Sequence, residues 1–336
     1  MAVGDGPLSI ATLTVICMVL GSSATVTYGR GDGHHLHVQY YKNTCPQAEN
    51  IIREAVMEAV TLDPGVAAAL VRLQFHDCFV NGCDASILLE ETPSREPVEV
   101  TSPSNVGVRG FEVIDEAKTR LEKECPGTVS CADIVAFAAR DASVASGIRH
   151  YLIPAGRRDG LASRAIDTKG NLPKPSSNVS VMANIFTKKG LNLHDLVTLL
   201  GSHSFGVSHC SSFDYRLYNF SQMEAMDPQL DMLFAFTLKL ACPKVDKRDF
   251  KVHFDYITPN RLDNFYYLRI LYGKGLLYSD QVLLEDPQAR EIVARMAFDP
   301  DYWNMEFGKA MIRLGRTDVL TGTQGEIRRQ CRFVNQ

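Results

Sequence analysis

The chain has 336 residues, of which 45% are hydrophobic and 22% are charged, and its formal net charge is -4. These values describe a globular protein with ample core, in one domain or two closely packed ones. Basic residues are neither in excess nor clustered, so nucleic-acid binding is not expected.

The N-terminal region resembles a targeting segment. An apolar stretch from Leu8 to Leu20 precedes the small residues 21–24, although no Lys or Arg comes before it. It is too short to cross a bilayer, and no later apolar run is long enough. We therefore predict a secretory signal peptide at 1–29 and a mature domain at 30–336 without a membrane span. No extension is evident near Gln336, which favours the apoplast or cell wall over the vacuole.

Helical periodicity dominates the mature chain. Ile51, Ala55 and Ala59 form one apolar stripe, and a second helix is predicted to open at Asp63-Pro64 and to continue past His76. Further helices are predicted at 111–121, 134–145, 193–201, 229–240, 263–271, 287–297 and 302–314. Strand signals are few and short, so the fold is predicted to be mainly α.

Local motifs predict a helix start, two loops and an N-terminal tail. Ser130 to Asp133 has the spacing of a capping box. Two polar, Pro- and Ser-rich stretches, 91–103 and 167–180, are predicted loops, and the second falls where two helical lobes could divide. The histidines at 34, 35 and 37 could bind a metal, but a frayed N-terminal tail is the preferred interpretation.

The most informative segment runs from Arg72 to Ser86. Arg72 and His76 are four residues apart, so on a helix their Cβ atoms lie about 5–6 Å from one another. A neutral imidazole can take a proton from one oxygen of a peroxide while a guanidinium stabilises charge on the other. This pairing indicates chemistry rather than packing.

A second histidine, His203, ends an apolar helical run. A lone histidine in that position is more often a core residue than a ligand. Two separated histidines in apolar helices, one of them with an arginine four residues before it, instead suit a planar metal cofactor between two lobes.

From about Tyr40 to Asn335 the chain resembles the secretory plant haem peroxidases, class III. The matching blocks are Arg72–Ser86, Val108–Phe111, Val129–Asp133, Gly156–Asp159, Asn171–Pro173, Gly201–Gly206, Arg216–Phe220, Asp263–Tyr267, Gly275–Gln281 and Leu320–Gly325. The resemblance implies a mainly α fold with few short strands, in which two helical lobes sandwich a haem. The distal lobe would span about 40–165 and the proximal lobe about 175–320, with the C-terminal segment tied back to the distal lobe.

The resemblance also implies roles for single residues. His76 would be the distal base, Arg72 its electrostatic partner and Phe75 a wall of the pocket. His203 would be the axial ligand of a haem b iron, and Asp280 would accept its far N–H, which strengthens the imidazole as a donor.

Two further assignments concern Asp280 and the donor site. Taken alone, Asp280 would be interpreted as a helix N-cap rather than as a partner of a ligand. Pro173, in the block Asn-Leu-Pro, matches the residue near the haem edge that contacts aromatic donors.

One pair departs from the family pattern, which has a Glu and, six residues later, an Asn that orients the distal histidine. An ungapped alignment places Val98 and Ser104 there, whereas a one-residue slip places Glu99 and Asn105. The slip is favoured, because Pro103 then nearly restores the usual Pro-Asn pair. If Ser104 is the occupant, the distal base is less well oriented and peroxide reduction should be slower.

Two Ca²⁺ sites are implied as well, since dense oxygen donors suit hard cations. Without the neighbouring histidines, a solvated acidic loop would be the preferred interpretation of either set. The family's Thr is replaced by Ser204, and each site would fix the backbone beside a catalytic histidine. The expected ligands are Asp77, Val80, Gly82, Asp84 and Ser86 at the first site, and Ser204, Asp255, Thr258 and Asp263 at the second.

Cysteines and sequons agree with export. Nine cysteines become eight once Cys17 leaves with the leader, an even number that suits disulfides in an oxidising compartment, although spacing leaves the connectivity open. Two N-x-S sequons, at Asn178 and Asn219, fit a glycoprotein. By resemblance the pairs are Cys45–Cys125, Cys78–Cys83, Cys131–Cys331 and Cys210–Cys242.

The expected function is that of a secreted, monomeric haem peroxidase that reduces hydrogen peroxide to water and oxidises phenolic donors by one-electron steps. Lignification, cell-wall cross-linking, the oxidative-stress response and hydrogen peroxide catabolism are the expected roles. One alternative is a wall protein that keeps the haem but has lost efficient turnover. Another is an intracellular peroxidase that uses ascorbate or a protein partner.

Overall fold

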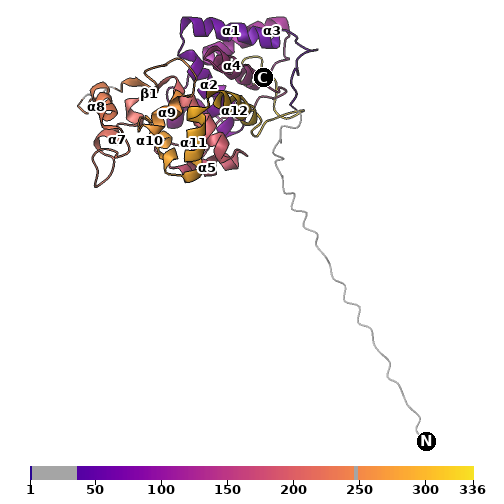
Figure 1. Cartoon of the computed structure of the whole chain (residues 1–336). Helices are drawn as coiled ribbons and strands as arrows, with labels where there is room; N and C mark the ends of the chain where they lie inside the picture. The colour runs from indigo at the N-terminus through magenta and orange to yellow at the C-terminus, as the bar shows by residue number, and fades with distance from the viewer. Residues whose placement is uncertain (2–35, 246–248) are drawn as a thin grey trace. The chain divides into compact units, whose positions relative to one another are not determined.

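The computed structural model describes residue 1, residues 36–245 and residues 249–336. The predicted leader, with Cys17, and two of the three N-terminal histidines, residues 34 and 35, lie outside the described residues. The described residues 36–245 and 249–336 belong to one compact unit. Its described part contains twelve α-helices and two three-residue strands, which confirms the mainly α prediction (Figure 1).

Four helices near the start of this unit pack against each other. α4 contacts each of the other three, and both α2 and α4 are buried along most of their length because nearly every residue in them is apolar or small. The bounds are α1 Ala48–Leu62, α2 Val66–Val80, α3 Phe111–Glu124 and α4 Cys131–Ala145.

A second group of helices follows. α6 contacts α5, α11 and α12, and α9 packs on α11. A single buried apolar cluster includes residues from both groups, so they share one core. The bounds are α5 Val179–Lys188, α6 Leu193–Leu200, α9 Phe265–Leu271, α10 Tyr278–Gln281, α11 Pro287–Phe298 and α12 Pro300–Leu314.

A smaller apolar cluster lies under α7 (Tyr215–Tyr218) and α8 (Met232–Ala241), which contact each other. The two strands, β1 (Val207–His209) and β2 (Lys251–His253), form an antiparallel pair in which Ser208 faces Val252. In Figure 1, α7, α8 and β1 lie together at one edge of the described unit. Short 3₁₀ segments occupy 86–88, 99–101, 103–105, 165–168, 201–204, 210–212 and 282–284.

Three local predictions differ in detail from the structure. α2 begins at Val66 rather than at Pro64, because the Asp63 carboxylate accepts from the Gly65 N–H and holds a turn there. Ser130 does cap α4 by accepting from the Asp133 N–H, but the Asp133 carboxylate is bonded elsewhere, so the capping box is only half formed. His37 is not frayed, because its backbone pairs with Ala155.

The disulfides and a buried arginine fasten distant segments. The structure contains the four pairs that the resemblance implies: Cys45–Cys125, Cys78–Cys83, Cys131–Cys331 and Cys210–Cys242. The fully buried Arg328 donates to the carbonyls of Ala85, Gly160 and Cys331. The C-terminal segment is therefore tied to the part of the chain that carries α2 and α4.

Candidate active site

One face of α2 is left uncovered by protein. Ala68, Arg72 and Phe75 are the only residues of this helix that are not buried, and their spacing places them on the same side. At one end of that face, Gly206 approaches so closely that a Cβ on it would lie 2.8 Å from the Cβ of Ala68. The open face of α2 is thus adjacent to the segment that carries His203.

The distal histidine is held by two hydrogen bonds of opposite sense. Nδ1 of His76 lies 2.6 Å from Oδ1 of Asn105, and because an amide oxygen only accepts, Nδ1 carries the proton. Nε2 is then the basic nitrogen, and it accepts from Nε of Arg72 at 3.1 Å. Asn105 is itself fixed, since its amide donates to the Glu99 carbonyl at 2.7 Å.

Burial and charge keep His76 neutral. Burial lowers the pKa of His76, the Arg72 guanidinium lowers it further, and the hydrogen bond with Asn105 only partly offsets them, so the pKa lies at about 3. The imidazole can therefore accept a proton across the whole physiological range. A general base needs this state.

The structure also distinguishes the two alignments of the distal asparagine. Asn105 is buried beside His76, whereas the neighbouring Ser104 is exposed. Glu99 is fully buried and accepts from the Asn81 amide at 2.8 Å. The slipped alignment is therefore the one that the chain adopts.

The remaining pocket residue of α2, Phe75, is half-buried. Its ring stacks on Phe79 with the centroids 4.1 Å apart and meets the His76 ring edge-on at 5.9 Å. A residue in this position limits the space beside the distal histidine.

His203 is arranged as a metal ligand would be. Nδ1 donates to Oδ1 of Asp280 at 2.8 Å, which leaves the lone pair on Nε2, and the side chain is 30% exposed. The Phe254 ring stacks parallel to the imidazole with the centroids 4.5 Å apart. Asp280 is 1% exposed and also accepts from the Tyr266 hydroxyl and the Leu277 N–H, so its position is fixed. Asp280 therefore contacts His203, as the resemblance implies, and also accepts from the Leu277 N–H as a helix cap does.

These features fit a haem. A planar group would cover the otherwise open face of α2 on one side and would meet a free imidazole nitrogen on the other. The donor is a histidine supported by a carboxylate, a combination typical of haem proteins. Pro173 is half-buried in the loop before α5, two residues from Pro175, whose carbonyl accepts from Ser279 next to Asp280.

Buried oxygens without partners lie at the first predicted calcium site and at the nearby Glu99, which was not among the predicted ligands. Oδ1 of Asp77, Oγ of Ser86 and Oε2 of Glu99 are buried and form no hydrogen bond. Burial raises the pKa of Asp77, Asp84 and Glu99, and the nearby carboxylates raise it further for Asp77 and Glu99. A cation would relieve both the repulsion and the missing contacts, so this oxygen set fits one.

Two backbone features shape that loop. Gly82 has φ +112°, and a Cβ there would lie 2.2 Å from the Asp318 carbonyl oxygen, so only glycine fits. The carbonyl of Val80 accepts from the Lys189 ammonium at 3.1 Å, and the same ammonium bonds Asp318 at 2.9 Å. The Lys189 ammonium is therefore bonded to the Val80 carbonyl, which is one of the expected calcium ligands.

The second predicted set is also brought together. Oγ of Ser204 lies 3.1 Å from both Oδ1 of Asp263 and the Arg261 carbonyl, which share its single proton, and the Thr258 hydroxyl donates to Asp255 at 3.1 Å. These oxygens are paired with one another, so the fit to Ca²⁺ here rests on the hard donor set alone. Among the described residues, no three His, Cys, Asp or Glu side chains cluster closely enough to hold a metal by themselves.

Several residues of the site escaped the sequence reasoning. Asn81 and Tyr266 lie inside blocks that match the family but were given no role, and Phe254 and Lys189 lie in none of those blocks. All four act through contacts with other segments of the chain. Phe254 could have been suspected, because it directly precedes the predicted ligand Asp255. The Arg261 carbonyl carries no side-chain signal at all.

Comparison with known proteins agrees with this arrangement. A family model described as peroxidase matches residues 52–299. The chain is 44% identical to "Peroxidase 5" of Vitis vinifera over 89% of its own length and 92% of that protein, and 44% identical to "Peroxidase 66" of Arabidopsis thaliana over all of both. It is 41% identical to "Peroxidase 1" of Zea mays over 98% of this chain and 89% of that one.

The fold, the paired distal residues and these matches define a peroxidase, an enzyme class that uses hydrogen peroxide. More narrowly, the chain belongs to the class III plant peroxidase family, which implies haem as the cofactor. No helix in the ranges 36–245 and 249–336 is long and apolar enough to cross a membrane.

Proposed function

We propose that this enzyme is a secreted haem b peroxidase that oxidises phenolic donors by one-electron steps. The observation that carries the proposal is the basic Nε2 of a neutral His76, which faces Arg72 on the open side of α2. Four disulfides support an oxidising compartment, in agreement with the predicted leader. Apoplast or cell wall is the proposed destination.

In this proposal His203 would bind the haem iron through Nε2, with Asp280 holding the imidazole. When bound, haem supplies the electrons that reduce peroxide. Nε2 of His76 takes the proton from the near oxygen of hydrogen peroxide and returns it to the leaving oxygen, which departs as water. The Arg72 guanidinium stabilises the negative charge that develops while the O–O bond breaks.

Phenolic donors would approach at the edge of the site near Pro173, where a half-buried proline offers a flat apolar contact. Lignification, cell-wall cross-linking, the oxidative-stress response and hydrogen peroxide catabolism are the roles that we propose. Asn178 and Asn219 are exposed, as N-glycosylation requires. Asn178 caps α5 through Oδ1, which leaves its amide nitrogen free for a glycan.

The test is an absorption spectrum of the purified enzyme with and without hydrogen peroxide, followed by donor oxidation. A Soret band that changes with peroxide, and guaiacol oxidised much faster than ascorbate, are expected. A Soret band without turnover would favour the wall protein that has lost activity. Faster oxidation of ascorbate, or free thiols in a non-reducing titration, would favour the intracellular peroxidase.

The role proposed for Asn105 gives one prediction. Replacing Asn105 with valine removes the acceptor that orients the His76 imidazole, so the rate of reaction with peroxide should fall by about tenfold, the cost of one lost hydrogen bond. Stopped-flow mixing with hydrogen peroxide measures this rate. Ser104→Ala is the matched control and should be silent, because Ser104 is exposed. The opposite ranking of the two variants would overturn the assignment.

The low pKa of His76 gives a pH prediction. The base must be neutral to react, and its pKa is depressed to about 3, so activity toward peroxide should persist below pH 6.5 and fall only as the pH falls through about 3. The pH dependence of the stopped-flow rate checks this. A midpoint near the ordinary histidine value of about 6.5 would contradict it.

Calcium removal is expected to destabilise the chain. Without a cation, Asp77, Asp84 and Glu99 would be left as buried, mutually repelling carboxyls, at a cost on the order of 3 kcal/mol. Chelation should therefore lower the Tm, and activity should fall before the chain unfolds, because Asp77 follows His76. Differential scanning calorimetry with and without a chelator measures the shift. Glu99→Gln should reduce the Tm shift that chelation causes, whereas replacement of the exposed Glu96 by Gln should leave that shift as in wild type. A Tm that does not change on chelation of the wild-type protein would refute the site.

A further inference from the structure

One carboxylate oxygen of Asp280 accepts hydrogen bonds from two side chains. Oδ1 lies 2.8 Å from Nδ1 of His203 and 3.1 Å from the hydroxyl of Tyr266. The other oxygen, Oδ2, accepts from the Leu277 N–H at the longer distance of 3.3 Å. Tyr266 and His203 therefore share one acceptor atom, at the place where the proposed axial ligand is held.

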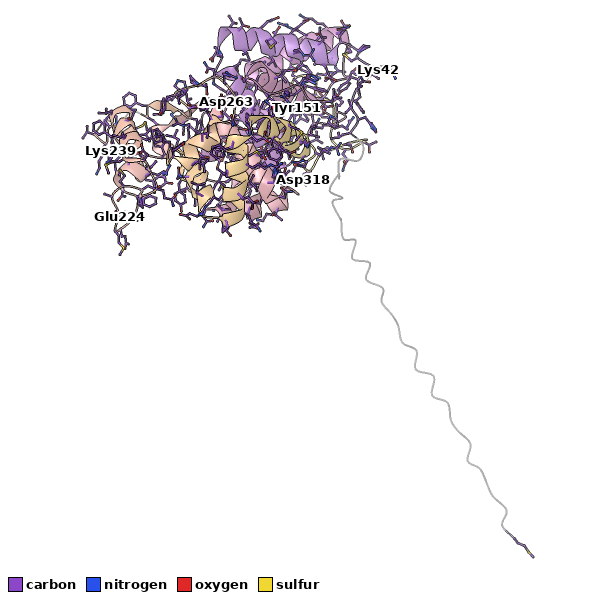
Figure 2. The ribbon with its side chains drawn as sticks, in the orientation of Figure 1. Lys42, Tyr151, Glu224, Lys239, Asp263 and Asp318 are labelled. Atoms are coloured by element: carbon purple, nitrogen blue, oxygen red, sulfur yellow. A yellow bond between two sulfur atoms is a disulfide. The ribbon has the colours of Figure 1, made fainter. Side chains whose placement is uncertain are left out.

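The Tyr266 side chain is held in position for this contact. It is 4% exposed, it lies in α9, and its ring meets the Tyr267 ring edge-on with the centroids 4.9 Å apart. It also lies edge-on to the His203 imidazole, at 6.4 Å between centroids. The start of α9 is fixed by the Asp263 carboxylate, labelled in Figure 2, which accepts from the first N–H of the helix at 3.0 Å. Packing therefore keeps the Tyr266 hydroxyl against Asp280.

Two donors on one oxygen weaken each other. Each donor draws electron density toward itself, so an oxygen that already accepts one hydrogen bond is a poorer acceptor for the next. A carboxylate that accepts the far N–H of a metal-bound histidine makes that imidazole a stronger electron donor. The Tyr266 hydroxyl opposes this effect because it occupies the same atom. The electron density on Nε2 of His203 therefore depends on Tyr266.

We propose that Tyr266 limits the electron donation of His203 to the haem iron by competing for Oδ1 of Asp280. The inference rests on the proposed function, in which His203 binds the iron. Tyr266 contacts the Nδ1 side of the imidazole pair, so it acts through Asp280 rather than on the peroxide. Hydrogen bonds behind the axial ligand are one of the means by which a protein sets the reduction potential of haem. Tyr266 thus keeps this potential higher than Asp280 alone would set it.

The experiment measures the ferric/ferrous reduction potential of the purified holoenzyme by redox titration of its absorption spectrum. Tyr266→Phe removes the hydroxyl and keeps the ring. It should favour the ferric form by about tenfold, the effect of one hydrogen bond, which is a shift of about 59 mV to more negative potential for a one-electron couple. The stretching frequency of the bond between iron and His203, measured by resonance Raman spectroscopy of the ferrous enzyme, should rise in the same variant.

Two further variants show how the effect arises. Tyr267→Phe is the matched control, because the neighbouring tyrosine is also buried and its hydroxyl donates to the Val197 carbonyl at 3.0 Å instead. It should leave the potential as in wild type. Asp280→Ala, reconstituted with excess haemin, should raise the potential. Adding Tyr266→Phe to Asp280→Ala should then change nothing further, because the shared acceptor is gone.

The inference and the proposed function fail in different ways. With a Soret band in the wild type, an unchanged potential or a positive shift in Tyr266→Phe would overturn the inference alone. An equal shift in Tyr267→Phe would assign the effect to a general disturbance of α9, and a shift that persists without Asp280 would assign it to another contact. Either result would also overturn the inference. A wild-type enzyme without a Soret band would overturn the proposed function, and the inference with it.

Discussion

Replacing His76 with alanine is expected to slow the reaction with hydrogen peroxide by about 10²–10⁴-fold while haem remains bound, since a positioned general acid–base typically contributes that much. The physical reason is that the basic Nε2 of His76 is the nitrogen hydrogen-bonded to Arg72, so the proton acceptor and the guanidinium are lost as a pair. Stopped-flow kinetics measure the rate, and the Soret absorbance reports the haem content.

The control is His194→Ala, which removes a histidine of similar size that bonds the Tyr302 hydroxyl instead. It should leave the peroxide rate unchanged. Normal turnover of His76→Ala would show that proton transfer uses another group, and loss of haem from that variant would point to a structural role for the residue.

Replacing His203 with alanine is expected to abolish tight haem binding. The Nε2 lone pair is the only contact with iron that the proposed arrangement provides. Loss of the carboxylate partner of a metal-bound histidine typically costs about 10–100-fold in affinity, so loss of the histidine itself should cost more. Titration of the haem-free protein with haemin, followed by absorbance, measures the affinity without reference to turnover.

Two variants sharpen this experiment. Asp280→Ala should weaken haem binding by an intermediate amount, because the imidazole remains but loses the acceptor that fixes its proton on Nδ1. His150→Ala, an exposed histidine in the loop after α4, should bind haem as wild type does. Full haem affinity in His203→Ala would mean that another residue binds the iron.

Much of the distal half of the site could be predicted from sequence. Arg72 and His76 are four residues apart on one helix, so the period of the helix alone places them side by side. The proposed first calcium site is equally local, since Asp77, near the end of α2, and Asp84, in the loop that follows, are close in the sequence. The relative positions of residues that are close in the sequence can be predicted without knowledge of the rest of the fold.

The sequence also left one local question open, because Val98/Ser104 and Glu99/Asn105 satisfy the same spacing. A one-residue slip in a loop changes no periodicity, so no helical or strand signal decides it. Burial decides it: the polar Asn105 is buried only because His76 and the Glu99 carbonyl satisfy its amide, whereas Ser104 can remain in solvent.

By itself, then, the sequence determined the helical fold, the family and the residues that lie near one another along the chain, because each follows from short-range spacing. Only the tertiary structure decided which distant partners meet. The pairing of His203 with Asp280, 77 positions away, followed from no local spacing and was expected only from the family resemblance, and Phe254 reaches His203 by packing rather than by motif. The exposure of the α8 side chains Phe236 and Leu240 is likewise invisible in sequence, since an apolar residue shows whether it is covered only after the chain has packed around it.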